Sequence, residues 1–211
     1  MSEAGAGQSY LQKGAIVATA PSTQAITTIP FQYNPGTLRR SLEAQVVGGE
    51  PGGHSATVRY TGSPVETISM DIEIDALAPS STVGGDVEAI YGIYPQLAAL
   101  ELLIYPSTTA LAANVALLAT GALEIAPYEA PLVLLVWGPN RSMPIKLQSY
   151  SIVEQAFAPD LSPIRATVSL TAQVLSAADV TSGSKPYAQF IVYQQAKEAF
   201  AAMAKARAPA S

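Results

Sequence analysis

Two segments of the chain alternate strictly between apolar and polar residues. In residues 67–76 and again in residues 165–174, every second position holds an isoleucine, methionine, valine, leucine or alanine. Because successive side chains of a β-strand point to opposite faces, this period of two predicts two strands, each with one buried and one solvated face.

Shorter apolar runs bounded by turn residues predict further strands. Residues 13–18 and 26–33 flank a turn of Pro, Ser and Thr and are expected to form a hairpin. Residues 132–137 are apolar throughout, which is typical of a strand buried on both faces. Residues 145–157 predict a strand that pairs with the following one, because residues 158–163 contain two prolines and an aspartate and favour a turn.

The remaining patterns indicate helices and loops. Apolar spacing over residues 86–104 predicts a helix with Asp86 as its N-cap, which Pro95 should kink or restart. The alanine-rich residues 187–207 predict a C-terminal helix. Residues 46–56 hold four glycines and a proline and predict a flexible loop.

Together these elements predict a mainly β fold with flanking helices: an antiparallel β-barrel or sandwich with one central helix and a C-terminal helix. We expect a flexible arm at residues 1–10, one domain over residues 11–176, and a linker with the last helix over residues 177–211. An apolar stretch at about residues 106–131 has no predicted structure and is interpreted as an insertion that offers a contact surface. Its most apolar part, residues 110–123, is shorter than the ~20 residues that span a membrane.

Composition narrows the function. Hydrophobic residues make up 49% of the 211 residues and charged residues 13%, so we expect part of the apolar surface to face partner proteins. The net charge of −5 and the lack of a basic stripe argue against nucleic acid as a ligand. The absence of cysteine excludes thiol catalysis and disulfides. No apolar segment of signal-peptide type follows the first residues, so we expect assembly in the cytoplasm.

Three candidate chemical sites are given a structural interpretation. His54, the one histidine, lies in the glycine-rich loop, where no fixed geometry would support a base or a metal ligand. Asp71, Glu73 and Asp75 share one strand face and are expected to be solvated, or to line a pore as a negative wall, rather than to bind calcium. Residues 182–185 match Ser-x-x-Lys but contain a glycine and precede a proline, so we expect a linker. We therefore predict no catalytic residue, no metal, no cofactor and no enzymatic activity.

Three short motifs occur in order: F-x-Y-N-P at residues 31–35, V-W-G at residues 136–138 and P-I-R-A at residues 163–166. With the run at residues 13–18, they resemble the contractile injection system tube and baseplate protein family of phage-tail-like particles. The similar members are small baseplate adaptors with a tube-like domain, commonly followed by a LysM module, which residues 177–211 lack. The resemblance implies a tube-like β-barrel subunit in a six-fold ring. Its implied partners are further copies of itself and the spike, inner tube, baseplate and sheath proteins of the same particle.

Four residues of the first motif are given structural or interface roles. Phe31 and Tyr33 are expected to fill alternating positions of a strand. Asn34 and Pro35 are expected to end that strand at the rim of the barrel, because the residue before a proline favours an extended conformation.

The other two motifs carry two more predictions. Trp137 is expected to anchor the core beside Gly138, where the backbone must turn. Arg165 is expected to form an ion pair with Asp160 or with a carboxylate of a neighbouring subunit.

The leading hypothesis is a structural baseplate component of a contractile injection system, a ring-forming adaptor between spike or inner tube and the baseplate and sheath. An inner tube subunit is the alternative within the same class, and it should polymerise alone. A β-barrel that binds a small apolar ligand is the alternative of another class, because a filled cavity would also explain the apolar composition.

Overall fold

The computed structural model describes residues 13–21, 23–47, 59–76, 90–120 and 129–206. The strands are β1 (Ala15–Thr19), β2 (Ile26–Pro30), β3 (Leu38–Glu43), β4 (Val46–Val47), β5 (Arg59–Tyr60), β6 (Val65–Asp75), β7 (Leu132–Val136), β8 (Ser142–Phe157) and β9 (Pro163–Val174). The helices are α2 (Tyr94–Glu101), α3 (Thr108–Ala119) and α4 (Lys185–Ala206). The predicted mainly β fold with flanking helices is confirmed.

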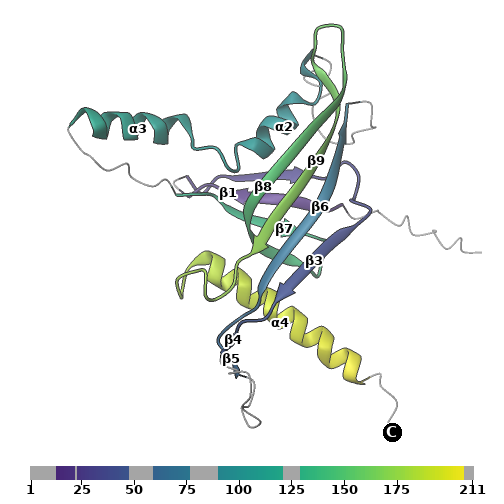
Figure 1. The fold of residues 1–211 in the computed structure, drawn as a ribbon, viewed down its shortest axis with the longest axis vertical. Helices are drawn as coiled ribbons and strands as arrows, with labels where there is room; N and C mark the ends of the chain where they lie inside the picture. Colours follow the sequence, from purple (N-terminus) through teal and green to yellow (C-terminus); the bar gives the residue numbers. More distant parts are fainter. Residues whose placement is uncertain (1–12, 22, 48–58, 77–89, 121–128, 207–211) are drawn as a thin grey trace, which may run out of the picture.

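Seven of these strands form one antiparallel sheet in the order β2-β1-β7-β8-β9-β6-β3, and β4 and β5 form a separate ribbon. Figure 1 shows the sheet as a curved, open layer, with α3 projecting to the left and α4 crossing the lower end. β2 and β3 form its two edges and do not pair with each other. The predicted closure into a barrel is therefore wrong for the described residues, because no strand among them joins β2 to β3.

The core lies on one face of the ladder formed by β8, β9 and β6. The two strands predicted from strict alternation are neighbours, and the register pairs Ile68 with Ala172 and Ile72 with Val168. All four of these side chains are buried. The alternation thus buries one face of both strands in a shared apolar layer, as the period of two requires.

The predicted hairpins are present. β1 pairs with β2, and β8 pairs with β9 over most of its length through the turn at residues 158–162. β7 lies between β1 and β8, and only Val133 and Leu135 on one face are fully buried, while the other face is half-buried. Burial of β7 on both faces is therefore only partial, since no helix among the described residues covers its second face completely.

The bounds and caps of the helices differ from those predicted from the sequence. α2 begins at Tyr94 with Pro95 in its first turn, a position where the missing N–H of proline costs no hydrogen bond. Asp86 lies outside the described residues, as do His54 and the predicted arm at residues 1–10. Within the apolar insertion, Ser107 caps α3 through a hydrogen bond of 3.2 Å that its hydroxyl accepts from the N–H of Ala110.

Three further strands were missed. β3 pairs with β6 as an edge strand, although residues 38–43 show no apolar alternation. Val46 and Val47 of the predicted glycine-rich loop pair with Arg59 and Tyr60 as the ribbon of β4 and β5. Pairing with a neighbour, and not local pattern, makes these segments extended.

Gly92 joins α2 to the end of the β8–β9 hairpin. Its backbone φ is +58°, in the left-handed region, and a Cβ atom there would overlap the carbonyl oxygen of Pro163. That same oxygen accepts a hydrogen bond of 2.9 Å from the N–H of Ile93, which is fully buried. Glycine is therefore required at this position for the helix to approach the strand.

We predict that Gly92→Ala lowers the free energy of unfolding by roughly 2–4 kcal/mol, because it combines a strained φ with a backbone overlap. Urea denaturation followed by circular dichroism measures this change. Gly36→Ala is the matched control: a Cβ atom there would meet nothing within 4 Å, so its effect should stay within ~0.5 kcal/mol. Equal stability of the two variants would contradict the assigned role of Gly92.

Candidate functional site

A buried carboxylate attaches α4 to the sheet. Glu66 of β6 points to the same face as the apolar positions of that strand, and its side chain is 5% exposed. Its Oε1 accepts from Arg40 of β3 at 2.6–2.7 Å and its Oε2 from the ammonium of Lys197 of α4 at 3.0 Å. The hydroxyl of Tyr193, also on α4, lies 3.2 Å from Oε1. Two cations and a phenol thus surround one carboxylate.

The electrostatics of this cluster keep Glu66 ionised and the Tyr193 hydroxyl protonated. Burial would raise the pKa of Glu66, but the hydrogen bonds and charges of Lys197 and Arg40 outweigh it, so the pKa lies below its usual value. Burial and the neighbouring Glu66 charge raise the pKa of the Tyr193 hydroxyl to about 12. Lys197 also lies 4.0 Å from the centre of the Tyr193 ring, a cation–π contact. Glu66 is therefore ionised and fully engaged, which makes it a structural group and not a general base.

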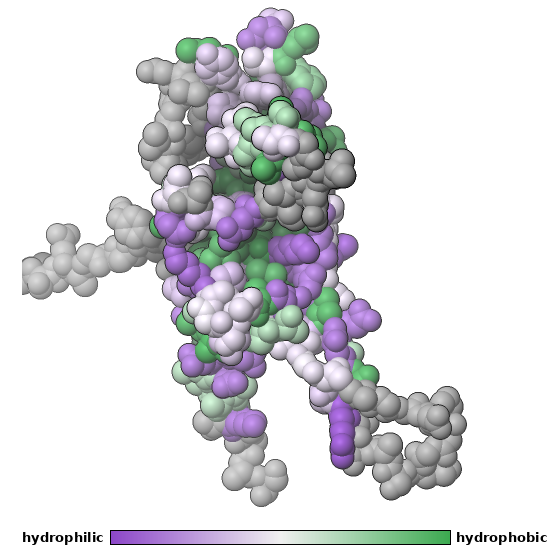
Figure 2. Space-filling model, turned by 90° about the vertical axis from the view of Figure 1, so that its left-hand side faces the viewer, coloured by the Kyte–Doolittle hydropathy of each residue, from purple (hydrophilic) through white to green (hydrophobic). Residues whose placement is uncertain are grey.

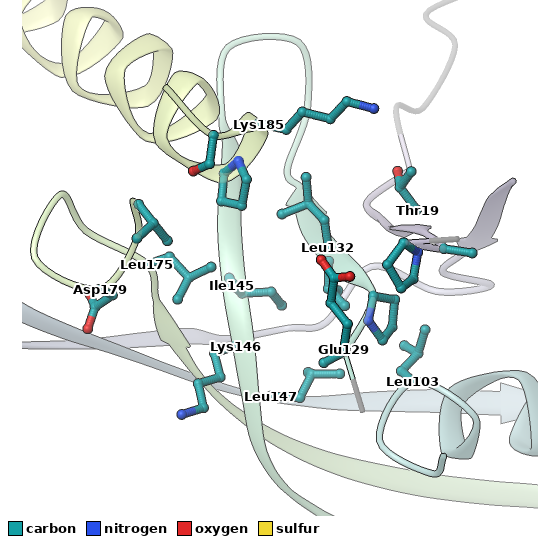
Figure 3. A pocket seen from close by; sticks show the side chains of 18 of the residues that line it. Thr19, Leu103, Glu129, Leu132, Ile145, Lys146, Leu147, Leu175, Asp179 and Lys185 are labelled. Atoms are coloured by element: carbon teal, nitrogen blue, oxygen red, sulfur yellow. The ribbon is translucent and has the colours of Figure 1, made fainter. Parts of the chain in front are cut away.

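An open groove lies between the end of α2 and the start of α4. It has a volume of about 760 Å³, and apolar side chains of β7 and β8, with Leu103 just after α2, form its floor (Figure 3). Ten of its side chains are labelled in Figure 3: Thr19, Leu103, Glu129, Leu132, Ile145, Lys146, Leu147, Leu175, Asp179 and Lys185. Figure 2 shows hydrophobic surface in this hollow, framed by hydrophilic residues. The groove opens to solvent and is not an enclosed ligand cavity.

α3 presents apolar side chains that nothing in the described part of the chain covers. None of its twelve residues is buried, although it contains only alanine, leucine, valine, threonine and one asparagine. Leu111, Val115 and Leu118 are 51%, 65% and 49% exposed and share one side of the helix, since they are spaced by four and three residues. The other side, including Ala110 and Ala113, lines a second open groove of about 840 Å³ against α2 and the start of β2.

The residues of the first motif lie around the start of β1. Phe31 follows β2, is 2% exposed, and its ring meets that of Trp137 edge to face at a centroid distance of 6.3 Å. Asn34 accepts a hydrogen bond of 2.8 Å from the N–H of Gly14 through its side-chain oxygen. Tyr33 is 46% exposed and Pro35 is half-buried. β2 ends at Pro30, so the expectation that Phe31 and Tyr33 fill strand positions and that Asn34 and Pro35 end the strand is wrong. The structure instead brings Phe31, Trp137 and Asn34 together, while Tyr33 is exposed.

Among the residues of the other two motifs, Arg165 has a partner that the sequence did not predict. Arg165 binds Asp75, its cross-strand neighbour on β6, through Nε at 2.8 Å and Nη2 at 2.6 Å, and not Asp160. Asp160 instead accepts hydrogen bonds from the backbone and hydroxyl of Ser162, which lower its pKa. Gly138 has a φ of +72° in the turn between β7 and β8. The register between β6 and β9 places Asp75 opposite Arg165 and so determines this ion pair.

The other candidate chemistry finds little support. Asp71 and Glu73 are exposed on the polar face of β6, and the hydroxyl of Ser169 donates to Asp71 at 2.6 Å. Across the residues described, no group of three or more His, Asp or Glu side chains is placed to hold a metal ion. Residues 182–184 precede α4, and Lys185 is its first residue, in contact with Gln24. No helix in the described ranges is long and apolar enough to cross a membrane.

Glu66 and Arg40 were missed in the sequence, although one signal was available. Glu66 stands two residues before Ile68, so the alternation of β6 places it on the apolar face. A charged residue in phase with a buried face requires a partner. The identity of that partner depends on the docking of α4, which the sequence pattern does not reveal.

Comparison with known proteins identifies a family. The model of the family described as contractile injection system tube protein matches residues 10–180. No curated protein matches the chain. The matched region contains every strand of the sheet together with α2 and α3, whereas α4 follows it.

We predict that Glu66→Gln lowers the free energy of unfolding by about 2 kcal/mol, because it leaves Arg40 and Lys197 without their shared countercharge in a mostly buried setting. Urea denaturation measures the loss. Glu73→Gln removes an exposed carboxylate from the opposite face of the same strand and serves as the control, with an expected change within ~0.5 kcal/mol. A Glu66→Gln protein as stable as this control would show that the cluster does not hold α4.

The same carboxylate predicts a pH dependence. Its pKa in the folded chain lies below the ordinary value of 4.5, so the stabilisation is fully present above about pH 4.5 and is lost as the pH falls through the lowered value. The stability difference between wild type and Glu66→Gln should therefore shrink on acidification from pH 6 to pH 3. Denaturation curves of both proteins across this range test it, and a difference that grows at low pH would reverse the assigned sign.

Proposed function

The chain belongs to the contractile injection system tube protein family, and on that premise we propose that it is a ring-forming baseplate subunit of such a particle. As a member of this family it is a structural component, with its partners in the same particle. In the proposed role, six copies surround the central axis and join the spike and inner tube to the baseplate and sheath. The observation that carries the proposal is the exposed apolar helix α3.

The physical argument rests on the cost of leaving α3 in water. A helix of its length is marginally stable by itself in water, and most helices gain their stability from packing one face against a core. Full burial of a leucine or valine side chain contributes roughly 1.5–3 kcal/mol. Leu111, Val115 and Leu118 stay 51%, 65% and 49% exposed within the described chain, so about half or more of this gain is still missing. A contact with another subunit would supply it.

The two edges of the sheet add a second surface for assembly. β3 carries Arg39, Arg40 and Glu43, charges that discourage uncontrolled pairing with another strand. β2 has the sequence Ile-Thr-Thr-Ile-Pro and carries no charge, and its Ile26 is 70% exposed. An added strand from a neighbouring subunit would therefore meet least opposition at β2.

The description of the matched family as tube protein favours one alternative, an inner tube subunit that stacks in many copies. The two roles differ in how the subunit assembles, because a tube subunit polymerises alone and an adaptor requires its neighbours. A small-ligand-binding β-barrel is not supported, since the sheet is open and the large cavities of the described residues are grooves.

We expect the triple variant Leu111→Gln, Val115→Gln, Leu118→Gln to fold normally but to fail in particle assembly, because all three side chains are exposed in the free subunit. Circular dichroism and urea denaturation check the fold, and electron microscopy of particles counts complete sheathed tubes, which should fall at least about tenfold. The matched control, Leu111→Met, Val115→Ile, Leu118→Met, keeps the apolar surface and should assemble. Normal assembly of the glutamine variant would remove α3 as the contact.

Two further observations separate the proposed role from its rivals. The purified chain alone should not polymerise into a tube. Particles produced without it should lack an organised tube and sheath. Long tubes formed by the chain alone would favour the inner tube subunit. Complete particles formed without the chain would overturn any structural role in tube initiation.

A further inference from the structure

A surface cavity beside the Glu66 cluster, open to solvent like the two grooves, carries an unexpected excess of positive charge. It has a volume of about 500 Å³ and lies between α4, the edge strand β3 and the turn that joins β7 to β8. Three of its lining residues are basic: Arg40, Arg141 and Lys197. In a protein with a net charge of −5, three cations around one cavity require an explanation.

The charges within the cluster account for only part of this excess. Glu66 is the carboxylate that Arg40 and Lys197 share, so one negative charge faces both. Arg141 makes no ion pair and no side-chain hydrogen bond within the described part of the chain, yet its charge reaches Tyr193 and acts to lower the pKa of that hydroxyl. The cavity therefore keeps an uncompensated positive charge that an anion would neutralise.

Aromatic side chains complete the wall of the cavity. Trp137, Tyr193 and Phe200 line it together with the cations, and Phe200 is 49% exposed. A guanidinium group binds a carboxylate through two parallel hydrogen bonds, and aromatic faces favour a hydrocarbon stem over a fully hydrated inorganic ion. The combination suits an acidic side chain, which brings a carboxylate on one or two methylene groups.

We propose that this cavity binds the carboxylate of an aspartate or glutamate presented by another protein of the particle, with Arg141 as the residue that recognises it. The identity of the partner rests on the proposed function, whereas the binding chemistry rests on the cavity alone. Arg40 and Lys197 position the site, because both already form ion pairs with Glu66. Arg141 sits on the turn between β7 and β8 and is free to form the paired hydrogen bonds.

The chain contains one tryptophan, Trp137, and it lines the cavity, so its fluorescence reports on the site without a label. The probe is a short capped peptide with two glutamates, titrated into the purified chain at constant ionic strength. The same peptide with glutamines and inorganic phosphate are titrated in parallel. We expect a saturable change with the glutamate peptide and a weaker response to the other two.

Arg141→Gln should raise the dissociation constant for the glutamate peptide at least about fivefold, and Arg141→Lys should lie between it and wild type, because the charge stays but the paired hydrogen bonds are lost. Arg39→Gln is the matched control, since Arg39 neighbours Arg40 on β3 but points to the opposite face, and its binding should equal wild type. Urea denaturation verifies that each variant is folded.

Three results would overturn the proposal: no saturable change, an unchanged dissociation constant in Arg141→Gln, or tighter binding of phosphate than of the peptide. The last result would assign the cavity to a free inorganic anion. None of these measurements involves particle assembly. A chain that binds the peptide but is dispensable for the particle would refute the proposed function and leave the site intact.

Discussion

The antiparallel ladder of β8, β9 and β6 is the constraint on which the rest of the structure depends, since α2 and α4 are both attached to it. At one end, Gly92 allows Ile93 to donate its N–H to Pro163. At the other end, Glu66 binds Arg40 and Lys197. A shift of register by one residue would expose the apolar face and displace both attachments at once. The alternation of β6 and β9 therefore determines where the helices can lie.

The two attachments are chemically different, with consequences for assembly. α2 contributes Leu97 and Leu100 to the apolar core, whereas α4 depends on a buried ion cluster at a site where most of its own surface stays exposed. Replacing a buried ion pair by apolar residues is often neutral for stability, so stability alone does not explain why a helix is attached by such a pair. Here the charges also define a cavity with surplus positive charge. We infer that the cluster orients α4 and at the same time prepares a surface for a partner.

The sequence predicted those parts of the fold that depend on local pattern. Strict alternation identified β6 and β9, and the proline-bounded turn identified the β8–β9 hairpin. β3 escaped because Arg39, Arg40 and Ser41 show no apolar period, and its extended form comes from pairing with β6. α3 escaped because its residues are apolar on every side, which leaves no period to detect.

The candidate site was predictable only in part, for the same physical reason. Phe31 and Trp137 are the aromatic residues of the F-x-Y-N-P and V-W-G motifs that were predicted to have structural roles, and the structure places them in contact. Arg165 was assigned to Asp160 or to a carboxylate of a neighbouring subunit, but it binds its cross-strand neighbour Asp75, 90 residues away. Ion pairs across a sheet depend on register, and register depends on the whole ladder. Only the phase of Glu66 within β6 pointed to a buried charge in advance.

The unequal edges of the sheet bear on how copies could meet. If two β2 edges paired with each other, the contact would be isologous, and a dimer would leave no free β2 edge for further growth. A contact between β2 of one copy and a different surface of the next is heterologous and can repeat around an axis. Whether such a series closes depends on the rotation between copies, which the curvature of the sheet and the reach of α3 would fix together. The proposed six-membered ring would therefore require the chain to present two different faces, and the charged β3 edge opposite the uncharged β2 edge would supply that asymmetry.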